Sequence, residues 1–524
     1  MRAESALGRE PLAAAVLAAA SALLIVTTAP PAIDAPAHLY RTELVREGVY
    51  LWDNLWYAGQ YPLLSYSVLY YPLAAIVGNV FLVAAAAVVS AAIFASLLLH
   101  EWGAVGRWPA RAYGVLAAGP LLTGTYTYAL GLACLLGTLR ALQLGRPGLA
   151  VLLAALTLGF SPLAFVFLLI ALLAVACAKR RLGPRSLLAG LGVFVGLQLA
   201  AFVAFPSDVV YPFGIWNLLG VLVASTFGIS LALRARHGEA LLAFFLLWGI
   251  VCVAAFFVTT PLGSNLTRLR FFVFPLGLLM VLMAGFRPRL LALPALALGF
   301  AYTAVPYLEI LPSRSDPLAA QESFWRPALE WVRANGGAGY RVEVIPTYGH
   351  WEAYWVPRSG IPLARGWYRQ LDVAQNPLLY DSVLSPTRYR HWLRRLGVRY
   401  VLLPKTRLDE LGARHEAELV RSGRAGLALV HSSPNWTIWE LPQATPILSG
   451  PGRAELTEFG HERVGGWTDG AGDYLLRVRY TPHWRAAGTA VCLSPAGNGL
   501  TRLKISRAGA FSLASGIRRD TASC

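Results

Sequence analysis

Residues 29–72 read APPAIDAPAHLYRTELVREGVYLWDNLWYAGQYPLLSYSVLYYP and separate the first long apolar run of the chain from the second. This stretch holds four of the ten acidic residues in the first 311 positions, together with a histidine, two tryptophans and many tyrosines. A plain link between two membrane helices does not need this chemistry, since most such connections are short. The stretch therefore predicts a structured, functional loop outside a membrane.

A short helix is predicted within this loop, at residues 35–47. Asp34 is a suitable N-cap, Pro36 suits the first helical turn, and Gly48 suits a C-terminal stop. Asp34 and His38 would then lie one turn apart on the same face of the helix. The aromatic residues with polar tips are typical of a membrane surface.

The composition indicates a membrane protein with room for two or more domains. The 524 residues are 56% hydrophobic and only 14% charged, with a mean hydropathy of +0.52. The net charge is +17, but the arginines lie mostly at the ends of apolar runs, as the positive-inside rule requires. We therefore predict membrane lipids as partners and no nucleic acid.

The apolar runs predict a mostly α-helical membrane protein with about eleven membrane-spanning helices, within a range of roughly nine to thirteen. Some runs are short and would need tilting or extension to cross the hydrocarbon layer. The predicted ranges are 11–28, 73–99, 112–122, 126–144, 148–160, 163–178, 186–205, 214–233, 240–259, 271–286 and 290–310.

The basic residues predict the orientation. The N-terminus and the connections near 100–111, 140–147, 179–185, 234–239 and 287–289 carry 14 Arg or Lys, whereas the opposite connections carry only Arg41, Arg46, Arg268 and Arg270. This asymmetry places the N-terminus in the cytoplasm of a multi-pass protein of the plasma (inner) membrane. With an odd number of spans, the loop 29–72 and the chain after residue 312 are extracytoplasmic.

The composition changes near residue 313. Segments 340–346, 397–404 and 436–442 read as strands, and segment 388–396 reads as a helix. The predicted domains are therefore a membrane domain at 1–311 that includes the loop 29–72, an α/β domain at 312–450, and a β-rich, sandwich-like module at 451–524. Cys492 and Cys524 could pair in this module, which the sequence does not decide.

The predicted topology restricts the groups that could act as a general base outside the membrane. The outer acids of the first 311 residues are Asp34, Glu43, Glu47, Asp53, Asp208 and Glu309. Asp34 is the best placed of them, beside His38 and Arg41, although an N-cap role would also explain it. Asp53 lies between Trp52 and Trp56, where a turn residue is the alternative.

Arg268 and Arg270 form a second candidate site because they break the positive-inside pattern. A guanidinium binds phosphate through two parallel hydrogen bonds, so these residues are candidates for a phosphate group. Anchoring at outer lipid headgroups explains them equally well. We expect an irregular loop here that runs into the start of a helix.

Other catalytic signatures are missing from the sequence. We find no Walker loop, dinucleotide fingerprint, HExxH or GxSxG motif, and no metal-ligand spacing among the five cysteines. No metal site is predicted, and a requirement for a divalent metal stays open.

The layout resembles the GT-C class of integral-membrane glycosyltransferases. It combines a first span, an outer loop that begins with an acid (Asp34, with His38, Tyr40 and Arg41 after it), many spans and an outer C-terminal domain. The strings WDNLWYAG (52–59), GVRYVLLP (397–404) and WTIWELP (436–442) are similar to those of uncharacterised bacterial members. Asp34 is followed by Ala35, where the protein mannosyltransferase branch has an Asp-Glu pair, so the branch and the acceptor stay open.

The resemblance implies inverting transfer of a hexose or pentose from a polyprenyl-phosphate sugar to an extracytoplasmic glycan, lipid or protein. An acid early in the loop would take the proton from the acceptor hydroxyl, a role that falls on Asp34 or else on Asp53. His38, Tyr40, Arg41 and Trp56 would bind substrate. Arg268 or Arg270 would offset the charge of the departing phosphate.

A second class of function is a non-catalytic glycan-binding protein anchored in the membrane, or a flippase for lipid-linked saccharides. Its supporting feature is the β-rich tail, where Trp467, Tyr474, Tyr480 and Trp484 could stack on sugar rings or pack in a core. The near absence of ionised residues within the spans disfavours transport.

Overall fold

The computed structural model describes residues 8–64, 66–206, 209–308, 316–336, 339–488 and 491–517. The chain forms two compact units. The first unit comprises residues 1–32 and 66–314, and the second comprises residues 33–65 and 315–524. Asp208, Glu309 and Cys524 lie outside the described residues.

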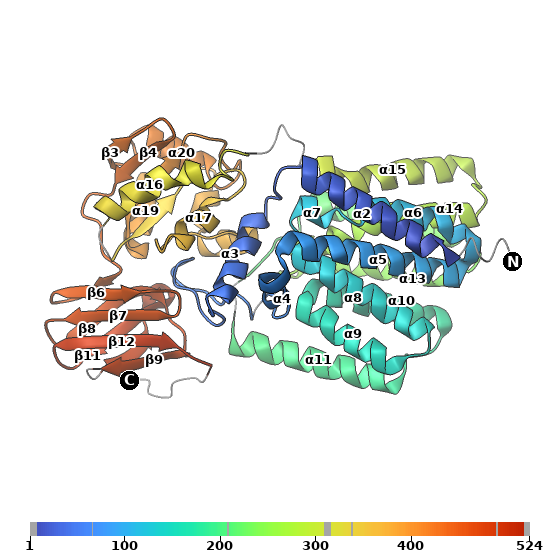
Figure 1. Ribbon diagram of the computed structural model, residues 1–524, viewed down its shortest axis with the longest axis horizontal. Helices are drawn as coiled ribbons and strands as arrows, with labels where there is room; N and C mark the ends of the chain where they lie inside the picture. The colour runs from blue at the N-terminus through green and yellow to red at the C-terminus, as the bar shows by residue number, and fades with distance from the viewer. Residues whose placement is uncertain are drawn as a thin grey trace. The chain divides into compact units, whose positions relative to one another are not determined.

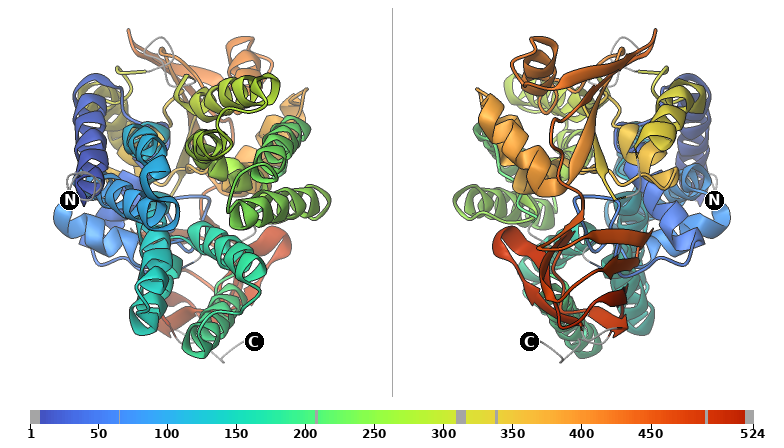
Figure 2. Two further views of the ribbon diagram at one scale, coloured as in Figure 1. Left: turned by 90° about the vertical axis from the view of Figure 1, so that its right-hand side faces the viewer. Right: turned by 90° about the vertical axis from the view of Figure 1, so that its left-hand side faces the viewer.

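The first unit is entirely helical where the structure describes it (Figure 1), and the left view of Figure 2 shows these helices roughly end-on. Glycines at 78 and 124, both with positive φ, end α4 and α7, whereas the Ser161 hydroxyl caps α10. The elements are α2 (Glu10–Thr28), α4 (Tyr70–Val77), α5 (Asn79–Trp102), η1 (Gly103–Gly106), α6 (Arg107–Leu116), α7 (Pro120–Thr123), α8 (Tyr126–Gln143), α9 (Pro147–Phe160), α10 (Pro162–Lys179), α11 (Arg185–Ala204), α12 (Ile215–Ala232), α13 (Glu239–Phe257), η2 (Gly263–Phe272), α14 (Val273–Met283) and α15 (Arg289–Leu308).

All eleven predicted apolar ranges contain helix, but the number of spans is not confirmed. Eight helical stretches within the described residues are long and apolar enough to cross a membrane, and α9 is a shorter apolar helix. The 3₁₀ helix η2 also replaces the irregular loop expected before Arg268. In a helix, the backbone carbonyl oxygens accept hydrogen bonds from the same segment and do not need water. Uniformly apolar stretches therefore favour helix.

Helix α2 packs through small side chains and one buried acid. Its buried alanines recur every four residues, and the backbone of Gly114 on α6 lies so close that a Cβ there would be 2.7 Å from the Ala14 carbonyl oxygen. At the start of α2, the buried Glu10 carboxylate binds Arg107 and Arg111 at 2.8 and 2.9 Å. This pairing offsets the charge that Glu10 buries.

The second unit contains an α/β part with one four-stranded sheet in the order β1-β2-β4-β3. Strands β1 and β2 are parallel and the other pairs are antiparallel. The strands predicted within 340–346, 397–404 and 436–442 and the helix at 388–396 are confirmed, with ends that differ by a few residues. The elements are α3 (Ala35–Arg46), α16 (Glu322–Asn335), β1 (Arg341–Val344), α17 (Glu352–Arg358), α18 (Arg369–Gln375), η4 (Pro377–Tyr380), α19 (Pro386–Leu396), β2 (Val398–Pro404), α20 (Arg414–Arg421), β3 (Ala428–Ser432) and β4 (Trp436–Glu440).

The rest of the second unit is β-rich, as predicted, with two four-stranded sheets in the orders β10-β11-β8-β5 and β6-β7-β12-β9. Tyr474 and Trp484 are buried in its hydrophobic core, and Cys492 is disulfide-bonded. The elements are β5 (Leu448–Ser449), β6 (Ala454–Phe459), β7 (Arg463–Thr468), β8 (Gly472–Arg479), β9 (Trp484–Gly488), β10 (Val491–Pro495), η5 (Gly497–Gly499), β11 (Leu500–Ile505) and β12 (Gly509–Ser515).

Residues 33–65 belong to the second unit, whereas the predicted boundaries kept this loop with the apolar half. Its backbone pairs with both parts of that unit: the Leu55 carbonyl accepts from the amide of Leu363, and the Asn54 amide donates to the carbonyl of His461. Trp52 joins the core of the β-rich part. Hydrogen bonds with residues some 300 to 400 positions away thus decide where the loop folds, and no local pattern encodes them.

Candidate functional site

Asp34 stands at the N-cap position of α3, as predicted, but its side chain makes no capping hydrogen bond. Its Oδ1 instead accepts a hydrogen bond from the indole Nε1 of Trp367 at 2.9 Å. The residue is partly buried. The Asp34 carboxylate is therefore positioned by tertiary structure, and the N-cap interpretation does not account for the orientation of its side chain.

The indole of Trp367 packs against two groups of the second unit. The imidazole of His350 stacks on it with ring centroids 3.1 Å apart and an angle of 9° between the planes. The guanidinium of Arg369 lies 4.8 Å from the same ring. These contacts help to fix the direction in which the Trp367 N–H points, toward Asp34.

Carboxylates in turn position Arg369 and His350. Arg369 binds both oxygens of Asp409 at 2.7 Å, in the bidentate geometry that is strongest for guanidinium and carboxylate. His350 places Nδ1 3.2 Å from Glu352 and Nε2 3.8 Å from Asp409. The residues around Asp34 are therefore supported by two successive sets of contacts.

The same face of α3 carries two more of the predicted residues. His38 is fully buried, with its ring 6.3 Å from that of Tyr368 in an edge-on arrangement. The guanidinium of Arg41 lies 4.4 Å from the centre of the Tyr368 ring. Residues at i, i+4 and i+7 lie on one helix face, so Asp34, His38 and Arg41 all meet the segment Trp367–Tyr368.

Gly366 lies just before Trp367 and allows the loop 33–65 to approach the segment Trp367–Tyr368. A Cβ at Gly366 would lie 2.6 Å from the indole of Trp56 and 2.8 Å from the ring of Tyr57. Any larger residue would force the two chain segments apart. Sequence reasoning missed Gly366, Trp367 and Tyr368, because nothing in the run GWYR at 366–369 relates it to a helix some 330 positions earlier.

The remaining three predicted residues of the loop form a separate cluster around Asp53. Asp53 is fully buried, and its Oδ2 accepts from the Tyr40 hydroxyl at 3.0 Å. Tyr40 stacks on Trp56 with centroids 4.5 Å apart, and the Trp56 Nε1 donates to the carbonyl of Ala353 at 3.0 Å. Burial, followed by the charge of Asp53, raises the pKa of the Tyr40 hydroxyl well above its usual value.

His461 completes the Asp53 cluster and was not predicted. The Asp53 Oδ1 lies 2.9 Å from His461 Nδ1 and also accepts from the Leu55 amide at 3.0 Å. Burial lowers the pKa of His461, but the hydrogen bond and charge of Asp53, with Glu47 3.3 Å from Nε2, outweigh burial and raise it overall. Both oxygens of Asp53 are engaged, so this cluster suits a structural role.

A buried ionic network is centred on Arg365, two residues before Trp367 in the chain. Arg365 binds three carboxylates, those of Asp372, Glu416 and Glu343. Burial by itself would raise the pKa of Asp372, but Arg365 and the Tyr380 hydroxyl outweigh it and hold this pKa below its usual range. Burial raises the pKa of Glu416 to about 7.

Arg268 and Arg270 lie in the first unit, on η2, and both are partly buried. The guanidinium of Arg268 is 5.9 Å from the ring of Tyr128, and that of Arg270 is 5.8 Å from the ring of Phe271. The hydroxyl of Tyr128 is buried and has no hydrogen-bond partner among the described residues. The guanidinium of Arg268 and the hydroxyl of Tyr128 could together bind an anionic oxygen.

Metal ligation finds no support in the arrangement of side chains. In the part of the chain that the structure describes, no group of three or more His, Cys, Asp or Glu side chains is placed to hold a metal ion. Comparisons with protein-family models and with curated proteins give no match for this chain.

Proposed function

We propose that this protein is a membrane glycosyltransferase that moves a sugar from a polyprenyl-phosphate donor to an extracytoplasmic acceptor, with Asp34 as the general base. The observation that carries the proposal is the side chain of Asp34, which does not cap its helix and accepts a hydrogen bond from Trp367. A carboxylate can act as the general base for an acceptor hydroxyl, and the Trp367 N–H fixes the direction in which this one points.

The proposed reaction is a single inverting displacement. Asp34 takes the proton from the acceptor hydroxyl, the acceptor oxygen forms a bond to the anomeric carbon, and the bond to the lipid phosphate breaks. The leaving group is the polyprenyl phosphate, whose negative charge needs a cation nearby. His38 and Arg41 lie on the same helix face as Asp34 and would bind the acceptor or the donor.

Asp53 takes a supporting role in this proposal. Its full burial and its three hydrogen-bond donors favour a function in holding the loop, with Tyr40 and Trp56 as its packing partners. It stays the alternative base, to which the assignment would move if Asp34 proved dispensable.

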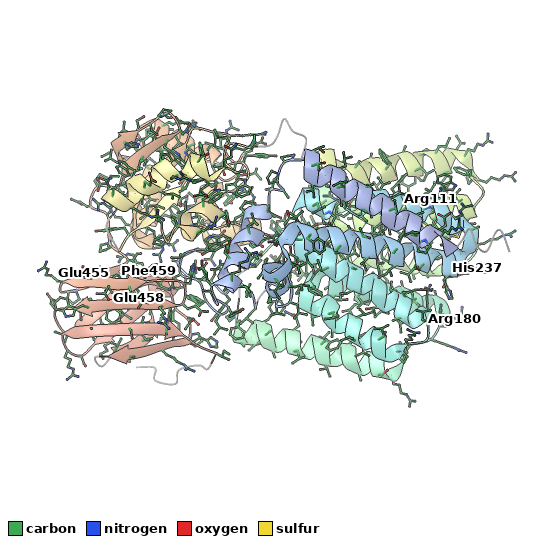
Figure 3. The ribbon with its side chains drawn as sticks, in the orientation of Figure 1. Arg111, Arg180, His237, Glu455, Glu458 and Phe459 are labelled. Atoms are coloured by element: carbon green, nitrogen blue, oxygen red, sulfur yellow. The ribbon has the colours of Figure 1, made fainter. Side chains whose placement is uncertain are left out.

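The proposed topology has eleven spans, a cytoplasmic N-terminus and an extracytoplasmic second unit. Eight apolar helical stretches support a membrane location. Figure 3 labels Arg111, Arg180 and His237 at the end of the first unit where α2 begins, which agrees with basic residues gathered on the cytoplasmic side. Reporter fusions at Arg9 and after Pro312 should report opposite sides of the membrane, and signals from the same side would contradict the topology.

The test of the proposed activity is sugar transfer in vesicles from a labelled polyprenyl-phosphate sugar. Wild-type protein should transfer the label, and Asp34→Asn should not, although it should be expressed and folded like wild type. Retained transfer by Asp34→Asn would reject Asp34 as the base.

Arg268 and Arg270 are proposed to bind the donor phosphate. Replacing both by Ala should weaken donor affinity at least tenfold, on the order of 1.5 kcal/mol or more, because charge-assisted bonds to phosphate are lost. Lys at either position should restore binding only in part, since it lacks the planar fork. If the double variant binds donor as well as wild type, these residues anchor headgroups instead.

A non-catalytic glycan-binding protein is the second candidate, and one observation favours it. Trp467 on β7 is 42% exposed, which leaves its ring open for a sugar to stack on, whereas Tyr474 and Trp484 are buried in the core. Under this alternative, Trp467→Ala would abolish glycan binding and Asp34→Asn would change nothing.

A further inference from the structure

Arg341 is a buried charge without a countercharge. It is the first residue of β1 and has no exposed surface. Its Nη1 donates to the carbonyl of Leu396 at 2.8 Å, but its Nε and Nη2 have no hydrogen-bond partner among the described residues. No carboxylate of those residues lies within ion-pair distance of it. Burying an unpaired guanidinium costs several kcal/mol, so proteins rarely leave one in this state.

A second buried arginine, Arg477, also lies at the C-terminal end of α19. Arg477 on β8 is 8% exposed and donates from Nε to the carbonyl of Arg394 at 3.1 Å. Its Nη1 donates to the carbonyl of Pro446 and the hydroxyl of Ser449, both at 2.8 Å. Arg341 and Arg477 therefore both bind the last carbonyls of α19, and neither has a carboxylate partner among the described residues.

Arg479 follows two positions later on β8. Its Nε donates to the carbonyl of Tyr57 at 3.0 Å. Burial, followed by the charges of Arg477 and Arg479, lowers the pKa of Arg341 to about 9. The three guanidiniums thus lie close enough to repel one another, in a place where the α/β part, the β-rich part and the loop 33–65 meet.

The surroundings offset this positive charge only in part. The C-terminal carbonyls of α19 carry a partial negative charge of about half an elementary charge. The ring of Phe459, labelled in Figure 3 on the β-rich part, lies 5.6 Å from the Arg341 guanidinium and covers it with an apolar surface. Neither contact uses Nε or Nη2.

The two unpaired nitrogens identify the missing partner. Nε and Nη2 lie on the same edge of a guanidinium, and this edge binds two oxygens of one carboxylate, phosphate or sulfate at once. Because Arg341 is fully buried, an anion on this edge would be enclosed as the second unit folds, which a headgroup attached to a lipid cannot be. We propose that the second unit binds a small free oxyanion, of the phosphate or sulfate type, on the Nε–Nη2 edge of Arg341, with Arg477 and Arg479 supplying further positive charge.

The bound anion would stabilise the contacts among the three parts of the second unit. Arg341 belongs to the α/β part, Arg477 and Arg479 to the β-rich part, and the Tyr57 carbonyl to the loop that carries Asp34. This role is independent of the proposed transferase activity, since none of the arginines touches Asp34 in the contacts described above.

The test uses full-length protein in detergent, with inorganic phosphate and inorganic sulfate as probes and sodium chloride at equal ionic strength as reference. Unfolding is followed by tryptophan fluorescence. We expect a saturable rise in Tm of about 2–4 °C for the wild type with either oxyanion. Arg341→Met should lose this rise, whereas Arg326→Met, which removes an exposed arginine from a salt bridge on α16, should keep it.

A second variant decides the matter if Arg341→Met does not fold. Arg341→Lys keeps the charge but lacks the two-nitrogen edge, so its apparent Kd for phosphate should rise at least tenfold while the protein stays folded. The proposal is overturned if the wild type responds to the oxyanions no more than to chloride, which a buried water on Arg341 would produce. It is also overturned if the Lys variant responds like the wild type, because the anion would then bind elsewhere.

Discussion

Asp34 and Asp53 belong to one loop, yet their surroundings differ completely. Asp34 is partly buried and accepts a hydrogen bond from one indole N–H, that of Trp367. Asp53 is fully buried and accepts from a tyrosine hydroxyl, a backbone amide and a histidine. The full burial and three donors of Asp53 suit a carboxylate that stabilises the fold, whereas the partly buried Asp34 suits the proposed proton transfer better.

The two clusters also connect the loop to different parts of the second unit. The Asp34 cluster connects α3 to the α/β part through Trp367 and Tyr368. The Asp53 cluster connects the loop to the β-rich part through His461. One loop therefore carries the candidate general base, Asp34, and also the Asp53 cluster that connects the loop to the β-rich part.

The largest expected effect comes from Asp34→Asn. The amide can still accept the Trp367 N–H but cannot take a proton, so the transfer rate should fall about 100-fold or more. The Tm should stay within about 1 °C of wild type, because the Asp34 side chain makes no capping bond. Parallel measurement of rate and Tm checks this, and a loss of stability equal to that of Asp53→Asn would erase the distinction between the two acids.

Asp53→Asn should show the reverse pattern. Removing a buried charge that accepts three hydrogen bonds should lower the free energy of unfolding by about 2–3 kcal/mol. The transfer rate per folded molecule should be essentially unchanged. Denaturant unfolding, combined with an assay corrected for the folded fraction, measures both. A full loss of transfer in a stable protein would move the base to Asp53.

The pH dependence of stability should report the Asp53 cluster through His461. Because the pKa of His461 is raised in the folded state, its pair with Asp53 stabilises fully below about pH 6.5 and is lost as the pH rises through the folded value. We therefore expect the free energy of unfolding to decrease between pH 6 and pH 8.

Glu416 adds a decline in the same direction, since its pKa moves from 4.5 to about 7 on folding and the folded state binds the extra proton between those values. The difference between wild type and His461→Gln therefore isolates the histidine. Identical pH profiles of the two proteins would show that the His461–Asp53 pair contributes nothing.

The smallest effect is expected from the indole hydrogen bonds. Trp367→Phe keeps a ring in contact with His350 and Arg369 but removes the donor to Asp34, and should lower the transfer rate several-fold, about 1 kcal/mol. Trp56→Phe is the matched control, because it removes an indole bond to the Ala353 carbonyl in the other cluster. The control should cost a similar amount of stability and leave the rate unchanged; equal rates for the two variants would contradict the importance of Trp367.

Local sequence patterns predicted the elements. The cap and stop signals around residues 34–48 predicted α3 (Ala35–Arg46), the apolar runs predicted helices, and alternation predicted β1, β2 and β4. Helical spacing alone placed Asp34 and His38 on one face. These patterns work because backbone hydrogen bonds and side-chain periodicity within an element depend on residues a few positions apart.

Tertiary structure alone decided which acid is available and what surrounds it. Trp367 is 333 positions from Asp34, and His461 is 408 positions from Asp53. The same is true of Arg341, whose missing countercharge is visible only once β8 and α19 surround it. Burial and long-range hydrogen bonds control whether a polar group is reactive, structural or in need of a ligand, and a sequence read locally carries no record of either.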